Sequence, residues 1–150
     1  MTAGYIHANA LALGEKGLLL RGTSGAGKSA LSLALISRFE DRGEFARLIG
    51  DDRVCVEPHG GRLVARPHPA TAGLIEARGA GLLRLPFEPA CVLTAIVDLL
   101  APGQLPPRYP EETEKNAVLQ GVVLPRFVTE GCGEASVARI IAFIQSITTI

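Results

Sequence analysis

A glycine-rich octapeptide between two apolar segments constrains the fold of this chain more than any other feature. Residues 22–29 fit the pattern G-x-x-x-x-G-K-[ST] at every fixed position. The apolar run 18–20 before the octapeptide predicts a strand, and the run 29–36 after it predicts a buried helix whose N-terminus faces the loop. In this context the motif indicates a strand, a phosphate-binding loop and a helix, in that order.

The residue types of the octapeptide suit a polyphosphate. Glycines at its first, fourth and sixth positions are expected to turn the backbone through positive φ, so that successive N–H groups face phosphate oxygens. The lysine supplies a compact positive charge for the β and γ oxygens, and the final serine hydroxyl can bind Mg²⁺. We therefore expect the nucleotide phosphates to bind at Gly22, Thr23, Ser24, Gly25, Ala26, Gly27, Lys28 and Ser29.

Length and charge restrict the other possibilities. A chain of 150 residues is expected to form a single domain over 1–150, with a core of its own. Its 15 basic and 15 acidic side chains balance, so net charge favours neither nucleic acid nor an anionic membrane as a partner. The apolar segment 90–101 is too short to cross a bilayer and contains Asp98. A hydrophobic content of 47% predicts a dense core or an apolar surface covered by neighbouring subunits, and we favour the second.

The cysteines indicate a reducing compartment. Cys55, Cys91 and Cys132 are odd in number and far apart, which predicts neither a disulfide framework nor a zinc site. The N-terminus shows no basic region followed by a long apolar core, so no signal peptide is predicted. We expect a cytoplasmic protein.

The alternation of apolar runs and turn signals predicts an α/β fold with a mixed central sheet that is entered through a β-hairpin. Strands at 7–13 and 17–21 flank the turn 14–16, ahead of the glycine-rich loop. A second hairpin signal surrounds Pro58-His59-Gly60-Gly61. The remaining expected elements are a helix from 28 to about 41–43, strands at 45–50, 90–100 and 121–128, a proline-rich loop at 101–107 and a packing helix at 136–148.

An acidic pair supplies the candidate catalytic groups. Asp51 and Asp52 follow the apolar strand 45–50, where phosphate-loop proteins place a carboxylate for Mg²⁺ or its waters. If the pair is extended, the two side chains point to opposite sides, so that one can serve the metal and the other can accept a proton from the attacking hydroxyl. The alternative is a solvated acidic turn, and the sequence does not decide which aspartate is the base.

These residues, together with a second motif, resemble a known family. The order of His7, the octapeptide, the acidic pair and Glu76-Ala77-Arg78-Gly79-Ala80-Gly81, which matches E-x-R-G-x-G, is similar to the catalytic domain of HPr kinase/phosphorylase. The likeness extends from Tyr5 to Val128. It implies a phosphate-loop kinase domain with a fold similar to HPr kinase and phosphoenolpyruvate carboxykinase. It also implies a short form without the separate N-terminal domain of many members.

The resemblance assigns a role to each candidate residue. His7 matches an active-site histidine that orients the catalytic aspartate, and Lys28 stabilises charge on the transferred phosphoryl group. Ser29 and Glu76 are implied as Mg²⁺ ligands. Arg108 aligns with an arginine that neutralises phosphate charge.

The function implied is that of a regulatory, ATP- and Mg²⁺-dependent protein serine kinase. Its substrate would be an HPr-like phosphocarrier of the phosphotransferase system, and its assembly a homohexamer. The proline-glycine-arginine-asparagine element that members carry after a strand like 121–128 is replaced by Thr129-Glu130-Gly131-Cys132-Gly133, which favours the kinase direction over phosphorolysis. Two other functions stay open: a phosphate-loop kinase for a small metabolite, and a regulatory module that senses ATP without transferring phosphate.

Overall fold

The hairpin expected ahead of the glycine-rich loop forms the middle of the sheet. The computed structural model describes residues 4–131 and 133–147, and in it β2 (Ala8–Leu13) pairs antiparallel with β3 (Lys16–Arg21). On its other side β3 pairs parallel with β9 (Cys91–Leu100), while β2 pairs antiparallel with β4 (Ala46–Gly50). Parallel and antiparallel pairs therefore meet in one sheet, which confirms the mixed sheet with hairpin entry.

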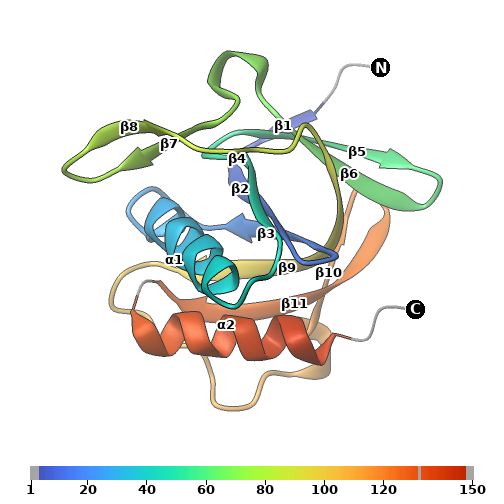
Figure 1. Ribbon diagram of the computed structural model, residues 1–150. Helices are drawn as coiled ribbons and strands as arrows, with labels where there is room; N and C mark the ends of the chain where they lie inside the picture. Colours follow the sequence, from blue (N-terminus) through green and yellow to red (C-terminus); the bar gives the residue numbers. More distant parts are fainter. Residues whose placement is uncertain (1–3, 132, 148–150) are drawn as a thin grey trace.

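The sheet forks at β9. The first residues of β9 pair with β6 (Arg62–Pro67), which continues to β5 (Val54–His59) and β1 (Gly4–Ile6). The later residues pair parallel with β11 (Val122–Glu130), whose other neighbour is β10 (Asn116–Leu119). Because one edge of β9 serves two strands, the sheet of the described residues, which has nine strands, curls around its own face (Figure 1).

A separate hairpin and four helical segments complete the fold. β7 (Leu74–Ala77) and β8 (Gly81–Arg84) form a two-stranded sheet that projects beyond the start of α1 (Lys28–Asp41) in Figure 1. The second long helix is α2 (Glu134–Ser146), and two short 3₁₀ turns are η1 (Pro69–Thr71) and η2 (Glu112–Glu114). Neither long helix in the described ranges has the length and apolar character needed to cross a membrane.

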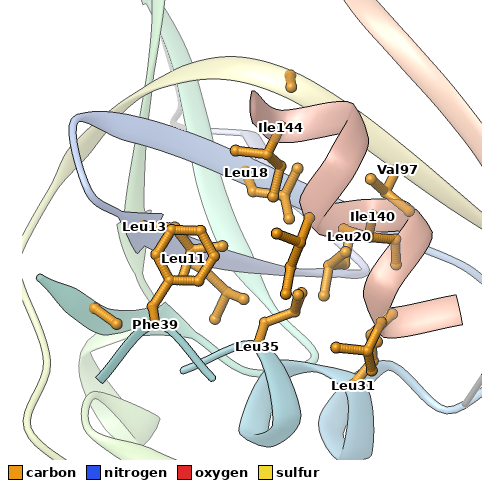
Figure 2. Close-up of a cluster of buried hydrophobic side chains, with 14 of the residues drawn as sticks. Leu11, Leu13, Leu18, Leu20, Leu31, Leu35, Phe39, Val97, Ile140 and Ile144 are labelled. Carbon is orange, nitrogen blue, oxygen red and sulfur yellow. The ribbon is translucent and has the colours of Figure 1, made fainter. Parts of the chain in front are cut away.

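Side-chain alternation divides the core in two. Leu11 and Leu13 of β2 face the helices, where Figure 2 shows them among buried side chains of β3, β9, α1 and α2. Ala8, Ala10 and Ala12 of the same strand face the opposite side and pack inside the curl, with residues of β5, β6 and β9. Successive residues of a strand point to opposite faces, so one strand supplies both cores. Asn9 lies on the same face of β2 as Leu11 and Leu13, the face toward the helices.

The structure moves some boundaries. α2 begins two residues before the predicted start and ends at Ser146, and Thr148, the predicted end, lies outside the described residues. The sequence pattern predicted neither β1 nor β10, because each is a short edge strand of three or four residues without a clear apolar alternation. Cys55 and Cys91 are unpaired, and Cys132 is not among the residues described.

Candidate active site

The glycine-rich loop connects β3 to α1, and its glycines are needed for two different reasons. Gly25 and Gly27 have φ angles of 86° and 100°, in the left-handed region that favours glycine. Gly22 does not have a positive φ, which corrects the expectation for this residue. A Cβ on Gly22 would lie 3.1 Å from the Leu99 Cβ and 3.2 Å from the Ala26 Cβ, so a larger residue at this position would require its neighbours to shift by a few tenths of an ångström.

The two polar side chains that end the loop motif face different partners. Lys28 is buried, and its Nζ donates to the carbonyl oxygens of Gly22, at 2.8 Å, and Thr23, at 3.4 Å. Its ammonium group therefore lies against the loop backbone. Ser29 Oγ donates to Asp51 Oδ1 at 2.6 Å. The glycine-rich loop and the acidic pair are thus in direct contact, through two residues that are 22 positions apart in sequence.

Asn9 joins the acidic pair to α1, and the sequence interpretation missed it. Its side chain is fully buried, and its Nδ2 donates to Asp51 Oδ1 at 2.7 Å and to Ser32 Oγ at 2.9 Å. Its Oδ1 accepts from the backbone N–H of Asp52 at 2.8 Å. The one signal for this role was an amide within the otherwise apolar strand ANALAL, since a buried polar side chain needs partners.

Asp52 does not continue the strand, contrary to the extended geometry expected for the pair. Its φ is 68°, a left-handed conformation at a bend after β4. The turn brings the Asp52 carboxylate to His7 Nε2, with which it forms a hydrogen-bonded pair. Both side chains are solvent-accessible, 66% for Asp52 and 49% for His7. The two aspartates still face different partners, but the bend achieves this and strand alternation does not.

Glu76 approaches the acidic pair through its backbone. Its N–H donates to Asp51 Oδ2 at 3.0 Å, so the start of the projecting hairpin is attached to the site. A cavity of about 270 Å³ opens here, between the acidic pair, Glu76, His68 and Leu82. Asp51 thus accepts hydrogen bonds on both carboxylate oxygens. Side chains from the loop and from β2 donate to one oxygen, and the hairpin backbone donates to the other.

The oxygen donors here fit a magnesium ion of the kind that phosphate-loop enzymes use. Ser29 offers a hydroxyl and Asp51 a carboxylate, and Glu76, whose backbone contacts Asp51, lines the adjoining cavity. Mg²⁺ is usually held by one or two carboxylates together with phosphate oxygens and water. Within residues 4–131 and 133–147 no group of three or more His, Cys, Asp and Glu side chains is close enough to hold a metal without such help. The donor set therefore suits a metal that arrives with a nucleotide.

Arg108 lies elsewhere. It lines a larger cavity, of about 420 Å³, together with residues of β11 and Arg139 of α2. The strand order β11, β9, β3, β2, β4 puts this cavity and the acidic pair on opposite sides of the strand that leads into the phosphate loop. The structure thus separates Arg108 from the other predicted catalytic and metal-binding residues, which lie in or beside the loop and the acidic pair: His7, Lys28, Ser29, Asp51, Asp52 and Glu76.

An ion-pair network lies beside the base of the loop. Asp98 of β9 accepts from Arg21 Nε at 2.6 Å, from Arg21 Nη2 at 2.8 Å, and from Arg126 Nε at 2.5 Å. Burial acts to raise the pKa of Asp98, but the hydrogen bonds and charges of the two arginines outweigh it, so the net pKa is lowered. The bonds to Asp98 likewise raise the pKa of Arg21. The network ties the end of β3 to β9 and β11.

Comparisons with known proteins identify the family of the chain. A family model described as "HPr Serine kinase C-terminal domain" matches residues 2–87, which include the loop, the acidic pair and Glu76. HPr kinase/phosphorylase of Mycoplasma mycoides subsp. mycoides is 37% identical over 76 residues, 51% of this chain and 22% of that protein. HPr kinase/phosphorylase of Clostridium beijerinckii is 39% identical over 67 residues, 45% of this chain and 20% of that protein. Each match thus spans about a fifth of the curated relative's length.

A solved structure extends the likeness to the whole fold. The HPr(Ser) kinase/phosphatase from Coxiella burnetii superposes with a TM-score of 0.77 at 23% identity, covering 95% of this chain and 94% of that one. The family model ends at Phe87, so β9 to α2 are matched at the level of fold alone. Because the family model covers more than half of the sequence, this chain belongs to the HPr serine kinase C-terminal domain family.

Proposed function

We propose that this chain is an ATP- and Mg²⁺-dependent protein serine kinase that acts on an HPr-like phosphocarrier of the phosphotransferase system. The observation that carries the proposal is the contact between Ser29 of the phosphate loop and Asp51, with Asp52 and His7 beside it. A loop that binds phosphates and a paired carboxylate that is open to solvent are the two parts that phosphoryl transfer to a hydroxyl needs.

The hydrogen bonds support different roles for the two aspartates. Asp51 accepts from Ser29, Asn9 and the Glu76 backbone, so its oxygens are directed toward the side where Mg²⁺ would bind. Asp52 has a solvent-facing carboxylate with one side-chain partner, His7. We therefore assign Asp52 as the general base and Asp51 to the metal side, with the Mg²⁺ supplying charge stabilisation when bound.

The transfer step follows from these assignments. Asp52 accepts the proton of the acceptor serine as the serine oxygen bonds to the γ-phosphorus and the bond to the β,γ-bridging oxygen breaks, releasing ADP. His7 holds the Asp52 carboxylate in place. Lys28, whose ammonium group lies against the loop backbone, offsets the negative charge that spreads over the phosphoryl oxygens.

The exposure of the base favours a protein acceptor over a small metabolite. A side chain that is 66% exposed can meet a serine on the surface of a folded carrier, whereas a metabolite kinase needs an enclosed pocket. The homohexamer, the likeness to phosphoenolpyruvate carboxykinase and reversal by phosphorolysis remain proposals that follow from the family resemblance alone.

A transfer assay tests the proposal. Purified protein, Mg-ATP and an HPr-like carrier are incubated, and mass spectrometry of the carrier is expected to show one added phosphate on a serine. Asp52→Asn should abolish transfer and keep ATP binding, and Asp51→Asn should weaken Mg²⁺-dependent binding as well. Asp41→Asn, at the exposed end of α1, is the matched control and should transfer normally.

Three other results would redirect the interpretation. Absence of transfer to any carrier, with ATP tightly bound, would reject the protein kinase. Phosphate appearing on a compound in a metabolite screen would then identify a small-molecule kinase. ATP binding with no acceptor of either kind would identify a sensor module.

A further inference from the structure

The larger cavity has the composition of a site for a partly apolar, partly polar ligand. It lies between the loop after β9, strand β11 and helix α2, and its volume of about 420 Å³ is within the range of small-molecule sites. Apolar and proline side chains form most of its wall, and charged groups add the polar contacts. The lining residues are Leu105, Pro106, Pro107, Arg108, Pro110, Glu114, Arg126, Phe127, Val128, Glu130 and Arg139.

This cavity adjoins the phosphate loop. Gly131 follows Glu130 at the end of β11, and a Cβ on Gly131 would lie 1.8 Å from the carbonyl oxygen of Ala26. The end of β11 and the phosphate loop are therefore in backbone contact, and only glycine fits at that point. Because Glu130 lines the cavity, the cavity begins one residue before the point at which β11 contacts the loop.

The direction of a bound nucleotide is set by the acidic pair. In the proposed function the γ-phosphate faces Asp52, at the end of β4, so the opposite end of the polyphosphate must leave the loop on another side. The sheet order puts β9 and β11 on the far side of β3 from β4. The cavity lined by β11 thus lies on the side toward which the nucleoside would point.

We propose that this cavity binds the nucleoside half of the donor nucleotide, an inference that rests on the proposed function. The wall formed by Phe127, Val128 and Pro107 supplies apolar surface for a purine base. The ion-paired Glu130 and Arg139 present hydrogen-bonding groups for the ribose or the base edge. The guanidinium of Arg108 can stack on the base or pair with the α-phosphate.

Comparing Mg-ATP with inorganic tripolyphosphate, which lacks a nucleoside, tests this assignment. In Val128→Tyr the larger side chain fills the cavity, so the Kd for Mg-ATP should rise about tenfold while that for tripolyphosphate stays within about twofold. Val123→Tyr, an exposed position of the same strand that lines no described cavity, is the control and should leave both values unchanged. Isothermal titration calorimetry gives both constants.

A fluorescence measurement tests the same assignment if the Val128→Tyr variant does not fold. The chain contains no tryptophan, so Leu105→Trp, at a side chain that is 80% exposed, introduces a single reporter on the cavity wall. Mg-ATP should change its emission saturably, tripolyphosphate should not, and Val118→Trp on β10 should respond to neither.

The outcomes separate the two proposals. Mg-ATP that binds by calorimetry without affecting the Leu105→Trp emission would overturn the cavity assignment and leave the kinase intact. Equal weakening of both ligands in Val128→Tyr would also overturn the assignment, because the substitution would then act on the phosphate loop. Failure of the unmodified protein to bind either ligand would reject the proposed function, and the cavity assignment with it.

Discussion

Replacing Asn9 by leucine tests whether the acidic pair is held in place by β2, the first strand of the hairpin ahead of the glycine-rich loop. The substitution removes the two bonds that Asn9 donates, to Asp51 and Ser32, and the one it accepts from the Asp52 N–H. A bond to a charged carboxylate contributes about 1.5–3 kcal/mol and a neutral bond about 0.5–1.5 kcal/mol. Burial of the leucine side chain offsets about 1–2 kcal/mol of that loss. We expect the free energy of unfolding to fall by about 2–4 kcal/mol.

The same substitution should slow phosphoryl transfer. With Asn9 gone, Asp51 keeps the bonds from Ser29 and Glu76, but the Asp52 backbone loses its anchor and the base can shift. A displacement of about 1 Å in a catalytic group costs about 10²-fold in rate. Urea unfolding gives the stability change, and the carrier phosphorylation assay gives the rate.

Ser32→Ala is the matched control for Asn9→Leu. It removes the hydrogen bond that Asn9 donates to Ser32. It leaves the bond that Asn9 donates to Asp51 and the bond that it accepts from the Asp52 N–H. We expect a loss of about 1–2 kcal/mol in stability, because the Ser32 bond to the Lys28 carbonyl is also lost, and a rate within about threefold of the unmodified protein. Equal rates for Asn9→Leu and Ser32→Ala would refute the reasoning, since Asn9 would then act through packing alone.

Three further predictions concern other groups. Lys28→Ala should lower transfer by about 10²–10³-fold in steady-state assays, and undiminished transfer would reject the loop assignment. Because the pKa of Asp98 is lowered in the folded state, ionised Asp98 contributes stability at pH values above its unfolded-state pKa of about 3.9. This stability is lost as the pH falls through the folded-state pKa. Asp98→Asn should therefore lower the free energy of unfolding by about 3 kcal/mol at pH 7 and weaken its dependence on pH below pH 7, as measured by denaturation curves. An unchanged pH dependence in this variant would exclude Asp98 as its source. Burial raises the pKa of Cys91 to about 12, so iodoacetamide at pH 8 should modify Cys91 slowly in the native protein and rapidly in urea; equal rates by peptide mass spectrometry would contradict this.

The local backbone of the candidate site could be predicted from sequence because it depends on short-range patterns. The octapeptide 22–29 fixes a turn between a strand and a helix, and its glycines and lysine have no common alternative use in that context. The hairpin before it and the buried strand at 91–100 follow from apolar runs and turn residues. Family membership was likewise predictable, because Glu76 and its glycines form a second motif at a characteristic distance.

Contacts between distant segments were not predictable, because each depends on how strands pair. Asn9 is a single polar residue within an apolar strand, and only the β2–β4 pairing brings it to the acidic pair. The extended geometry expected for Asp51 and Asp52 was wrong, since a left-handed bend at Asp52 turns its carboxylate toward His7. No local pattern encodes that bend.

What the sequence determined by itself is therefore the glycine-rich loop, its flanking elements and the set of candidate polar groups. What the tertiary structure decided is which of those groups meet: it brings Ser29, Asp51 and Asn9 into contact, and it places Arg108 on a cavity beyond β9, away from the acidic pair. The physical reason is that the loop conformation arises from backbone sterics within a few residues. The pairing of β2 with β4 and the fork at β9 depend instead on burying apolar faces that are remote in sequence.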